Sequence, residues 1–220
     1  MSTLAVSPSE PLSEQKDHSV VNDFSIQVAT VNGSGSQTAN SVLMRAIFQM
    51  GIPVSGKNMF PSNIAGLPTW FTIRASQKGY VGRRKEVDFL VAMNPETARE
   101  DVMKLPSGAA VVYDEPLKLN ELRGDLHFYP VPFDKLVGPV CPEARLRKLV
   151  RNMIYDGVVA QLLSIEMEEV QRALVKQFGK RKAKAAEMNW NAARAGFDYA
   201  ARTFAKTDPF RVERRNATAG

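Results

Sequence analysis

A glycine- and serine-rich turn at residues 33–38 is the part of the sequence best suited to bind a ligand. An apolar stretch precedes it, and a stretch with helical spacing of apolar residues follows it. A turn between a strand and a helix leaves backbone N–H groups free, and the positive end of the helix dipole strengthens their attraction for an anion. We therefore expect a phosphate site here. Its expected donors are the backbone amides of Gly33, Ser34, Gly35, Ser36 and Gln37 and the hydroxyls of Ser34, Ser36 and Thr38.

The charge around this turn favours the same interpretation. From Phe24 through Lys85 the chain contains no Asp or Glu, although several Lys and Arg residues occur there. Ordinary composition predicts about six acidic residues in a segment of this length. Lys57, on the neighbouring segment, is expected to supply a compact positive charge for the phosphate.

Two nucleotide-binding motifs are matched only in part. The dinucleotide fingerprint needs a third glycine where this chain has Thr38, and no acidic residue follows at the distance that binds a ribose hydroxyl. NAD is therefore disfavoured, while NADP stays open because Lys57 is able to pair with its 2′-phosphate. Residues 51–57 resemble a nucleotide-triphosphate loop, but Asn58 replaces the magnesium-binding Ser or Thr and Pro61 follows instead of a helix.

Residues that usually carry out catalysis are scarce. Cys141 is the single cysteine, and His18 and His127 are the two histidines. One cysteine cannot form an internal disulfide or hold a zinc ion or an iron–sulfur cluster by itself. We expect no catalytic residue and no metal site in this chain, so that any redox centre belongs to another chain.

The basic character of the protein is concentrated near its carboxyl end. Residues 171–220 hold 12 Lys and Arg against 4 Asp and Glu, while the whole chain has a net charge of +6. The tract 176–184 therefore allows a basic nucleic-acid-binding module as an alternative function. Because no interleaved aromatic platform accompanies the tract, and a charged run on a helix is usually a solvated face, we expect no nucleic-acid partner.

The hydrophobic pattern predicts an α/β fold. Strands are expected at 24–31, 52–55, 69–75, 88–92, 109–113 and 126–131, and helices at 38–50, 95–104, about 143–163, 167–178 and 182–204. Residues 56–68 are expected to form a loop, because Pro61 and Pro68 disfavour a long helix there. Apolar runs separated by helices predict a Rossmann-like open, mostly parallel sheet with helices on both faces, followed by a C-terminal helical extension.

The chain ends are polar. Residues 1–22 are expected to be a disordered tail, residues 23–205 one domain that includes the helices from about 143, and residues 206–220 a polar tail or linker. No apolar run of 18 or more residues and no basic leader with an apolar core occurs. We therefore expect a cytoplasmic protein with no membrane partner.

Several separated blocks of sequence carry a family resemblance. They are VNGSGSQTANSVLMRAIFQMGIPVSGKNMFPSNIAGLPTWFTIRAS, DFLVAMNPETAREDV, VPFDKLV, RLRKLVRNMIYDGVVAQLL and NWNAARAGFDYA. In this order they closely resemble the gamma domain of 2-oxoacid:ferredoxin oxidoreductases, in the form found at the start of the 2-oxoglutarate enzyme's alpha subunit. The likeness runs from about Asn22 to Ala205. Many members carry Gly-x-Gly-Gly-Gln-Gly in the turn, where this chain has Ser36 and Thr38 in place of two glycines.

The resemblance implies an enzyme that converts a 2-oxoacid, here 2-oxoglutarate, with coenzyme A and oxidised ferredoxin to an acyl-coenzyme A, here succinyl-coenzyme A, carbon dioxide and reduced ferredoxin. It further implies thiamine diphosphate, magnesium and [4Fe-4S] clusters in partner domains or subunits, and a dimerised hetero-oligomer. The gamma domain itself binds coenzyme A and helps to close the active site. On this basis Gly33 to Thr38 and Lys57 are expected to bind the phosphates of coenzyme A, with Ser55 and Asn58 as secondary candidates.

Overall fold

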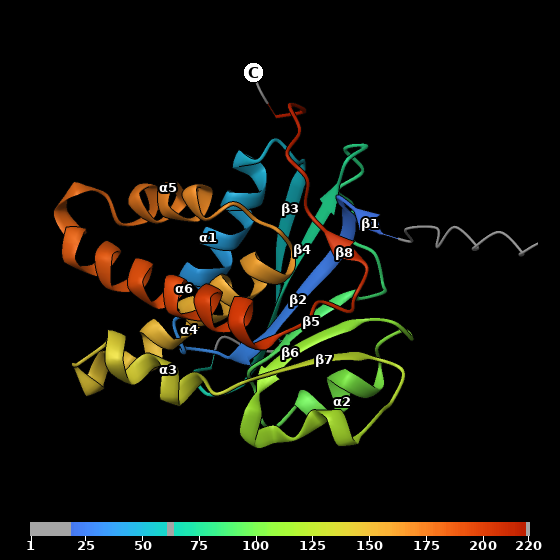
Figure 1. The fold of residues 1–220 in the computed structure, drawn as a ribbon, viewed down its shortest axis with the longest axis horizontal. Coiled ribbons are helices and arrows are strands. Elements are labelled where there is room, and N and C mark those ends of the chain that lie inside the picture. Colours follow the sequence, from blue (N-terminus) through green and yellow to red (C-terminus); the bar gives the residue numbers. More distant parts are fainter. Residues whose placement is uncertain (1–18, 61–63, 219–220) are drawn as a thin grey trace, which may run out of the picture.

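A six-stranded sheet forms the centre of the protein (Figure 1). The computed structural model describes residues 19–60 and 64–218. The strand order is β3-β4-β2-β5-β6-β7. These strands are β2 (Asp23–Val31), β3 (Val54–Met59), β4 (Pro68–Ser76), β5 (Phe89–Ala92), β6 (Ala110–Asp114) and β7 (His127–Val131).

Five of the six strands run in one direction. The β2–β5, β5–β6 and β6–β7 pairs are parallel, and β4 is antiparallel to both of its neighbours, β2 and β3. The chain crosses from β2 through α1 (Ser36–Gln49) to the sheet edge at β3, and β4 then returns between these two strands. The prediction of an open, mostly parallel sheet is confirmed.

The prediction of a loop from residue 56 was partly wrong. β3 continues through Gly56, Lys57 and Asn58 to Met59, where it pairs with β4 along its whole length. Most of its residues are exposed or half-buried because β3 is an edge strand. Its polar composition therefore hid a segment that backbone pairing with β4 stabilises.

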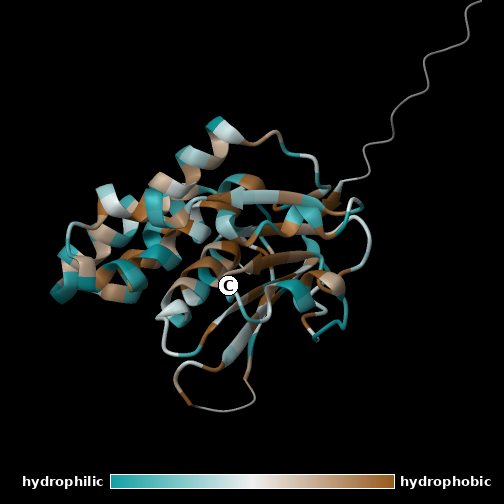
Figure 2. Ribbon diagram, turned by 90° about the horizontal axis from the view of Figure 1, so that it is seen from below, coloured by the Kyte–Doolittle hydropathy of each residue, from teal (hydrophilic) through white to brown (hydrophobic). Residues whose placement is uncertain are grey.

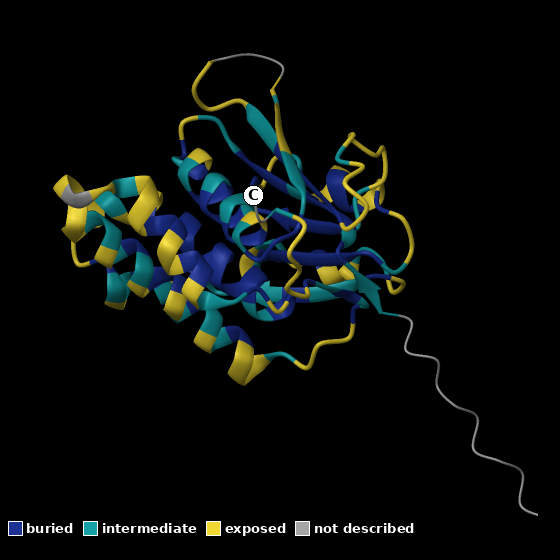
Figure 3. Cartoon of the chain, turned by 90° about the horizontal axis from the view of Figure 1, so that it is seen from above, coloured by how far each residue is buried: buried dark blue, intermediate teal, exposed yellow. Residues whose placement is uncertain are grey.

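Helices cover both faces of the sheet, as predicted. One face carries α1 and α4 (Ala144–Leu162), with α3 (Phe133–Val140), α5 (Met167–Phe178) and α6 (Ala183–Thr203) packed around them. The other face carries α2 (Ala98–Met103) and two short 3-10 turns, Glu115–Leu117 and Leu119–Glu121. Apolar residues fill the sheet and the inner faces of the helices, whereas the outer helix surfaces are polar (Figures 2 and 3).

The two longest helices approach each other closely at glycines. A Cβ added at Gly157 of α4 would overlap the carbonyl oxygen of Ala193 on α6, and one added at Gly196 of α6 would overlap the carbonyl oxygen of Ile154 on α4. The backbones of α4 and α6 are therefore in direct contact. This contact fixes α4, which lies beside the turn at residues 33–36.

The carboxyl-terminal segment differs from the predicted polar tail. We call residues 207–218 the C-terminal strap, because they pack back along the domain (Figure 1). Within the strap, β8 (Phe210–Arg211) pairs with β1 (Val20–Val21), and Phe210 and Val212 are buried. Two apolar side chains and a set of backbone hydrogen bonds are enough to order this segment despite its charge.

The strap also binds the end of α1. The backbone N–H groups of Arg215 and Ala217 donate to the carbonyl oxygens of Met50 and Gly51. Asn22, which the sequence places in the amino-terminal tail, hydrogen-bonds both the N–H and the C=O of Glu213. Residues 1–18 of the predicted tail lie outside the described residues. Among the described helices, none is both long enough and apolar enough to cross a bilayer.

Replacing Gly157 with Ala tests the α4–α6 contact. The added methyl group has no space, so we expect G157A to lower the free energy of unfolding by about 1–3 kcal/mol. Gly124 lies in open space without a positive φ, and G124A is expected to leave stability unchanged or raise it slightly. Urea unfolding of both variants measures the difference, and equal stabilities would contradict the close contact.

Asp156 on α4 predicts a pH dependence of stability. It is fully buried, its carboxyl oxygens have no hydrogen-bond partner among the described residues, and burial raises its pKa well above the ordinary value. The native state therefore keeps a proton that the unfolded chain releases above about pH 4, so stability falls as pH rises.

We expect Asp156→Asn to remove this decline, so that its stability relative to the unchanged protein increases between pH 4.5 and pH 8. Asp198→Asn, at an exposed position on α6, controls for the loss of a carboxylate. A constant difference across this pH range would contradict the prediction.

Candidate functional site

The turn between β2 and α1 depends on two glycines with left-handed backbone conformations. Gly33 has a φ of 84° and Gly35 a φ of 81°, a region that residues with a Cβ rarely adopt. Gly35 is the N-cap of α1, and no side chain caps this end of the helix. The two glycines let the chain reverse between the end of β2 and the start of α1 without covering the first helical turn.

The turn leaves several backbone donors free. Among the described residues, the N–H groups of Gly33, Gly35, Ser36 and Gln37 have no hydrogen-bond acceptor, whereas the N–H of Ser34 donates to Val31. The first turn of α1 contains no acidic residue. Four of the five amides expected from the sequence are therefore available to an anion at the positive end of the helix.

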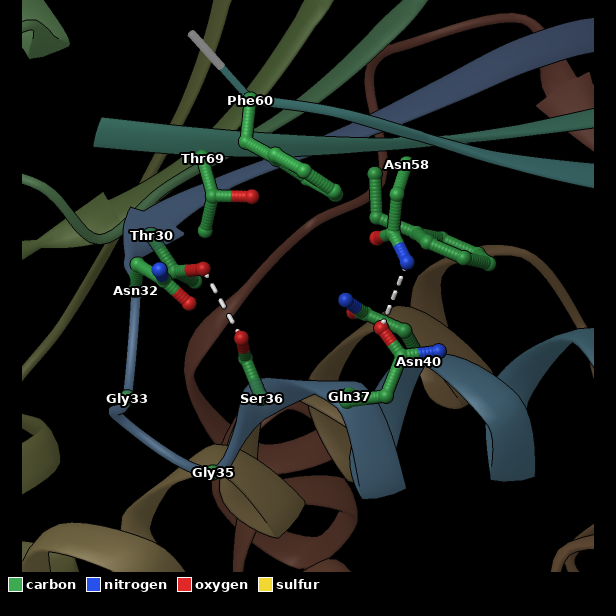
Figure 4. A pocket seen from close by; sticks show the side chains of 11 residues that line it. Thr30, Asn32, Gly33, Gly35, Ser36, Gln37, Asn40, Asn58, Phe60 and Thr69 are labelled. Atoms are coloured by element: carbon green, nitrogen blue, oxygen red, sulfur yellow. Dashed lines mark hydrogen bonds between the residues drawn. The ribbon is translucent and has the colours of Figure 1, made fainter. Parts of the chain in front are cut away.

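A cavity of about 350 Å³ opens beside these donors (Figure 4). We call it the turn pocket. Its walls come from the turn, α1, β3 and β4 and carry polar but uncharged side chains as well as two phenylalanines. The lining residues are Thr30, Asn32, Gly33, Gly35, Ser36, Gln37, Asn40, Asn58, Phe60, Thr69 and Phe71.

Hydrogen bonds between side chains hold the walls of the turn pocket. The hydroxyls of Thr30 and Ser36 lie 2.9 Å apart, and the Asn58 Nδ2 donates to Gln37 Oε1 at 3.0 Å (Figure 4). The Tyr155 hydroxyl donates to Asn40 Oδ1 at 2.9 Å. Burial raises the pKa of Tyr155 well above its ordinary value, so this hydroxyl keeps its proton and remains a donor. The polar groups are thus oriented before a ligand arrives.

Asn58 is brought to the turn, but Lys57 and Ser55 are not. Successive side chains of a strand point to opposite faces of a sheet. Asn58 lies on the α1 side, as does Gly56, where an added Cβ would meet Met44 of α1. Lys57 and Ser55 consequently face the other side, and the Ser55 hydroxyl donates to the backbone oxygen of Val81.

Ser34 in the turn and Thr38 in the first turn of α1 do not line the turn pocket. Ser34 lines a second cavity on the opposite side of the turn. Thr38 borders a groove lined mainly by apolar side chains of α4, α5 and α6. Of the nine site residues named from the sequence, the turn pocket contains Gly33, Gly35, Ser36, Gln37 and Asn58.

Further residues, two of them far away in the sequence, complete the site. Asn152 on α4 donates from Nδ2 to the carbonyl oxygen of Ser34 at 2.8 Å. Asn40 and Tyr155 form the hydrogen bond described above, and Asn32 donates from Nδ2 to the carbonyl oxygen of Ile64. Sequence reasoning missed these residues because single Asn and Tyr side chains carry no local signal for a site.

The other reactive side chains serve structural contacts. Cys141 is buried, and its thiol donates to the backbone of Glu143 at 3.5 Å. His127 Nδ1 lies 2.9 Å from the Thr207 hydroxyl of the C-terminal strap. Among residues 19–60 and 64–218, no group of three or more His, Cys, Asp or Glu side chains is placed to hold a metal ion. What the described site offers a ligand is a set of free backbone donors at the positive end of α1.

The sheet topology defines a Rossmann-like α/β domain, and the turn after its first long strand leaves an open helix terminus with free backbone N–H groups. The family model of pyruvate ferredoxin/flavodoxin oxidoreductase matches residues 25–199, and the chain belongs to this family of oxidoreductases.

Solved structures with the same fold include three oxidoreductase chains. A chain of 2-oxoglutarate:ferredoxin oxidoreductase from Magnetococcus marinus, with 2-oxoglutarate, coenzyme A and succinyl-CoA bound, is 25% identical with a TM-score of 0.79. The match covers 89% of our chain and 34% of that chain, so our chain spans about a third of its length.

The other two matches share the fold over nearly their full length. The gamma subunit of a keto/oxoacid ferredoxin oxidoreductase from Geobacter sulfurreducens is 16% identical, with a TM-score of 0.63 and coverage of 82% of our chain and 99% of the subunit. Pyruvate oxidoreductase subunit PORC from Thermotoga maritima is 15% identical, with a TM-score of 0.63 and coverage of 80% and 96%. A search of curated protein sequences finds no match.

Replacing Asn152 with Ala tests how the turn is held. The variant leaves the carbonyl oxygen of Ser34 without its donor, so we expect the free energy of unfolding to fall by about 1–3 kcal/mol. Amide hydrogen exchange of Ser34, whose N–H donates to Val31, should also accelerate. Asn189→Ala is the matched control, because Asn189 is also buried but donates to Ala185 within its own helix. Equal effects of the two variants would argue against a specific role for Asn152.

Proposed function

We propose that this chain is the coenzyme A-binding part of a thiamine-dependent 2-oxoacid:ferredoxin oxidoreductase that acts on 2-oxoglutarate. The observation that carries the proposal is the group of four unpaired backbone N–H groups at the start of α1, in a segment free of carboxylates. Coenzyme A carries phosphate groups, and such a helix terminus is well suited to bind one of them.

The turn pocket extends this binding beyond the phosphate. The side-chain amides of Asn32, Gln37, Asn40 and Asn58 line it, and Phe60 and Phe71 add apolar surface. A ligand that combines phosphates with amide groups and short hydrocarbon segments, as coenzyme A does, matches such a lining. Lys57 and Ser55 are not part of this proposal, because the pleat of β3 turns them away from the turn pocket.

In this proposal the chain positions one reactant and leaves the reaction to partner domains or subunits. Thiamine diphosphate with magnesium supplies the decarboxylation of the oxoacid, and [4Fe-4S] clusters pass the electrons to ferredoxin. The residues of this chain bind coenzyme A and orient its thiol, which lowers the entropic cost of bringing the two reactants together. None of them is assigned a catalytic role, and the assembled enzyme is a hetero-oligomer located in the cytoplasm.

The choice of 2-oxoglutarate rests on the bound ligands and the identity of the Magnetococcus marinus enzyme. That chain is 25% identical to ours, whereas the pyruvate and keto/oxoacid enzyme subunits are 15% and 16% identical. The NADP alternative loses support, because Lys57 does not face the turn. For the nucleic-acid alternative, part of the basic charge is already paired, since Arg214 binds Glu166 and Glu169 within the domain.

Gln37→Glu separates binding from stability. A carboxylate at the start of α1 repels a phosphate but interacts favourably with the helix dipole. We expect Q37E to weaken coenzyme A binding to the full chain about tenfold or more, measured by calorimetry, while the free energy of unfolding stays constant or rises by about 0.3–1 kcal/mol. Gln171→Glu, at an exposed position on α5, makes the same charge change away from the site.

Ligand-induced thermal stabilisation compares the possible cofactors. Coenzyme A at 100 times its dissociation constant should stabilise the chain by about 2.7 kcal/mol. A larger stabilisation by NADP than by coenzyme A at the same concentration would overturn the proposal. Unchanged coenzyme A binding by Q37E would also overturn it. In the assembled enzyme, Q37E should raise the KM for coenzyme A and leave the KM for 2-oxoglutarate unchanged.

A further inference from the structure

A second cavity, of about 180 Å³, lies on the other side of the turn. We call it the switch-point pocket. It is found at the carboxyl ends of β2 and β5, which are neighbouring parallel strands. The lining residues are Thr30, Val31, Ser34, Met93, Pro95, Lys148, Arg151 and Asn152.

The sheet topology makes this cavity a favourable ligand site. From β2 the chain passes through α1 towards β3 on one side of the sheet, and from β5 it passes through α2 towards β6 on the other. The two connections diverge, so the carboxyl ends of β2 and β5 are not covered by a crossover. Open α/β sheets commonly bind their ligands at such a point.

Two cations from one face of α4 line the switch-point pocket. Lys148 is exposed, and no carboxylate of the described residues lies within 4.0 Å of its ammonium group. Arg151, one turn further along, binds Asp114, and its Nε lies 3.4 Å from Asp134. The Arg151 guanidinium also lies 5.6 Å from the centre of the Phe133 ring, which further limits its movement. The switch-point pocket therefore combines Lys148, which has no ion pair among the described residues, with Arg151, which is fixed by its ion pairs.

A buried hydroxyl without a partner points to the same ligand chemistry. Ser34 is 9% exposed and lines the switch-point pocket, and its Oγ has no hydrogen-bond partner among the described residues. Such a group costs free energy when it is buried and unpaired. An oxygen atom of a ligand in the pocket would provide the missing partner.

The charge differs between the two sides of the turn. Thr30 lines both cavities, but the turn pocket has no charged side chain, whereas the switch-point pocket has Lys148 and Arg151. A phosphomonoester carries close to two negative charges at pH 7. Lys148 supplies an unpaired positive charge for it, while Arg151, whose charge is shared with Asp114 and Asp134, and the Ser34 hydroxyl add hydrogen-bond donors. A volume of about 180 Å³ suits a terminal group.

We propose that the switch-point pocket binds a terminal phosphoryl group through Lys148, Arg151 and Ser34. Its source is either free phosphate or the 3′-phosphate of coenzyme A, and the second assignment rests on the proposed function. In that case coenzyme A lies across the turn, with its diphosphate at the start of α1 and its 3′-phosphate beside α4.

Lys148→Gln in the full chain tests the proposal against three probes: coenzyme A, 3′-dephospho-coenzyme A and inorganic phosphate. We expect calorimetry to show that K148Q weakens coenzyme A binding about tenfold and leaves dephospho-coenzyme A binding unchanged. Lys184→Gln, at an exposed position on α6, is the control. An equal loss for both coenzymes, or no loss for either, overturns the assignment to the 3′-phosphate.

Inorganic phosphate separates this inference from the proposed function. If coenzyme A does not bind but phosphate binds and is weakened by K148Q, the proposed function fails and the phosphoryl site is supported. If Q37E weakens coenzyme A binding while K148Q affects none of the three probes, the proposed function is supported and the phosphoryl site is overturned.

In Ser34→Ala, stability and ligand binding are expected to change in opposite directions. Because it removes an unpaired buried hydroxyl, we expect the ligand-free chain to be as stable as the unchanged protein or more stable. Phosphate and coenzyme A binding should nevertheless weaken. Unchanged binding of both probes would overturn the role of this hydroxyl.

Discussion

The hydrogen bond from Asn152 to the carbonyl oxygen of Ser34 joins the binding turn to α4 across 118 residues of sequence. A turn with two left-handed glycines has few contacts of its own, so its shape depends on such external support. Asn152 satisfies the carbonyl group of Ser34 and leaves the N–H groups of Gly35 and Ser36 free. The position of α4 therefore determines the geometry of the donors, and α6 fixes α4 through direct backbone contact at Gly157.

Helix α1 is held at both of its ends by segments distant in sequence. Tyr155 of α4 contacts its first turns through Asn40, and the C-terminal strap binds the carbonyl oxygens of Met50 and Gly51 at its last turn. The free N–H groups therefore belong to a helix that cannot easily shift along its axis. A rigid helix end matters for a domain whose proposed role is to present one reactant, because positioning is effective only when the bound geometry is maintained.

The two sides of the turn offer different kinds of hydrogen-bond donor. The turn pocket offers backbone N–H groups and neutral amides such as Gln37 and Asn58, while the switch-point pocket offers Lys148 and Arg151. A polyanionic ligand placed across the turn meets both kinds of donor without any carboxylate on the turn itself.

The sequence alone predicted β2, α1, α5 and the glycine turn, because hydrophobic periodicity and glycine conformation depend on near neighbours. The absence of acidic residues around the turn is likewise read directly from the sequence. The α5 helix was predicted with the bounds found, Met167–Phe178. Tertiary structure alone decided that Asn58 faces the turn and Lys57 faces away, that Asn152 and Lys148 lie beside it, and that residues 207–218 pack as a strap. The side to which a residue of β3 points follows from the pairing of β3 with β4, and the neighbours of the turn follow from the packing of α4. Both depend on contacts between residues far apart in the chain, which local sequence patterns do not contain.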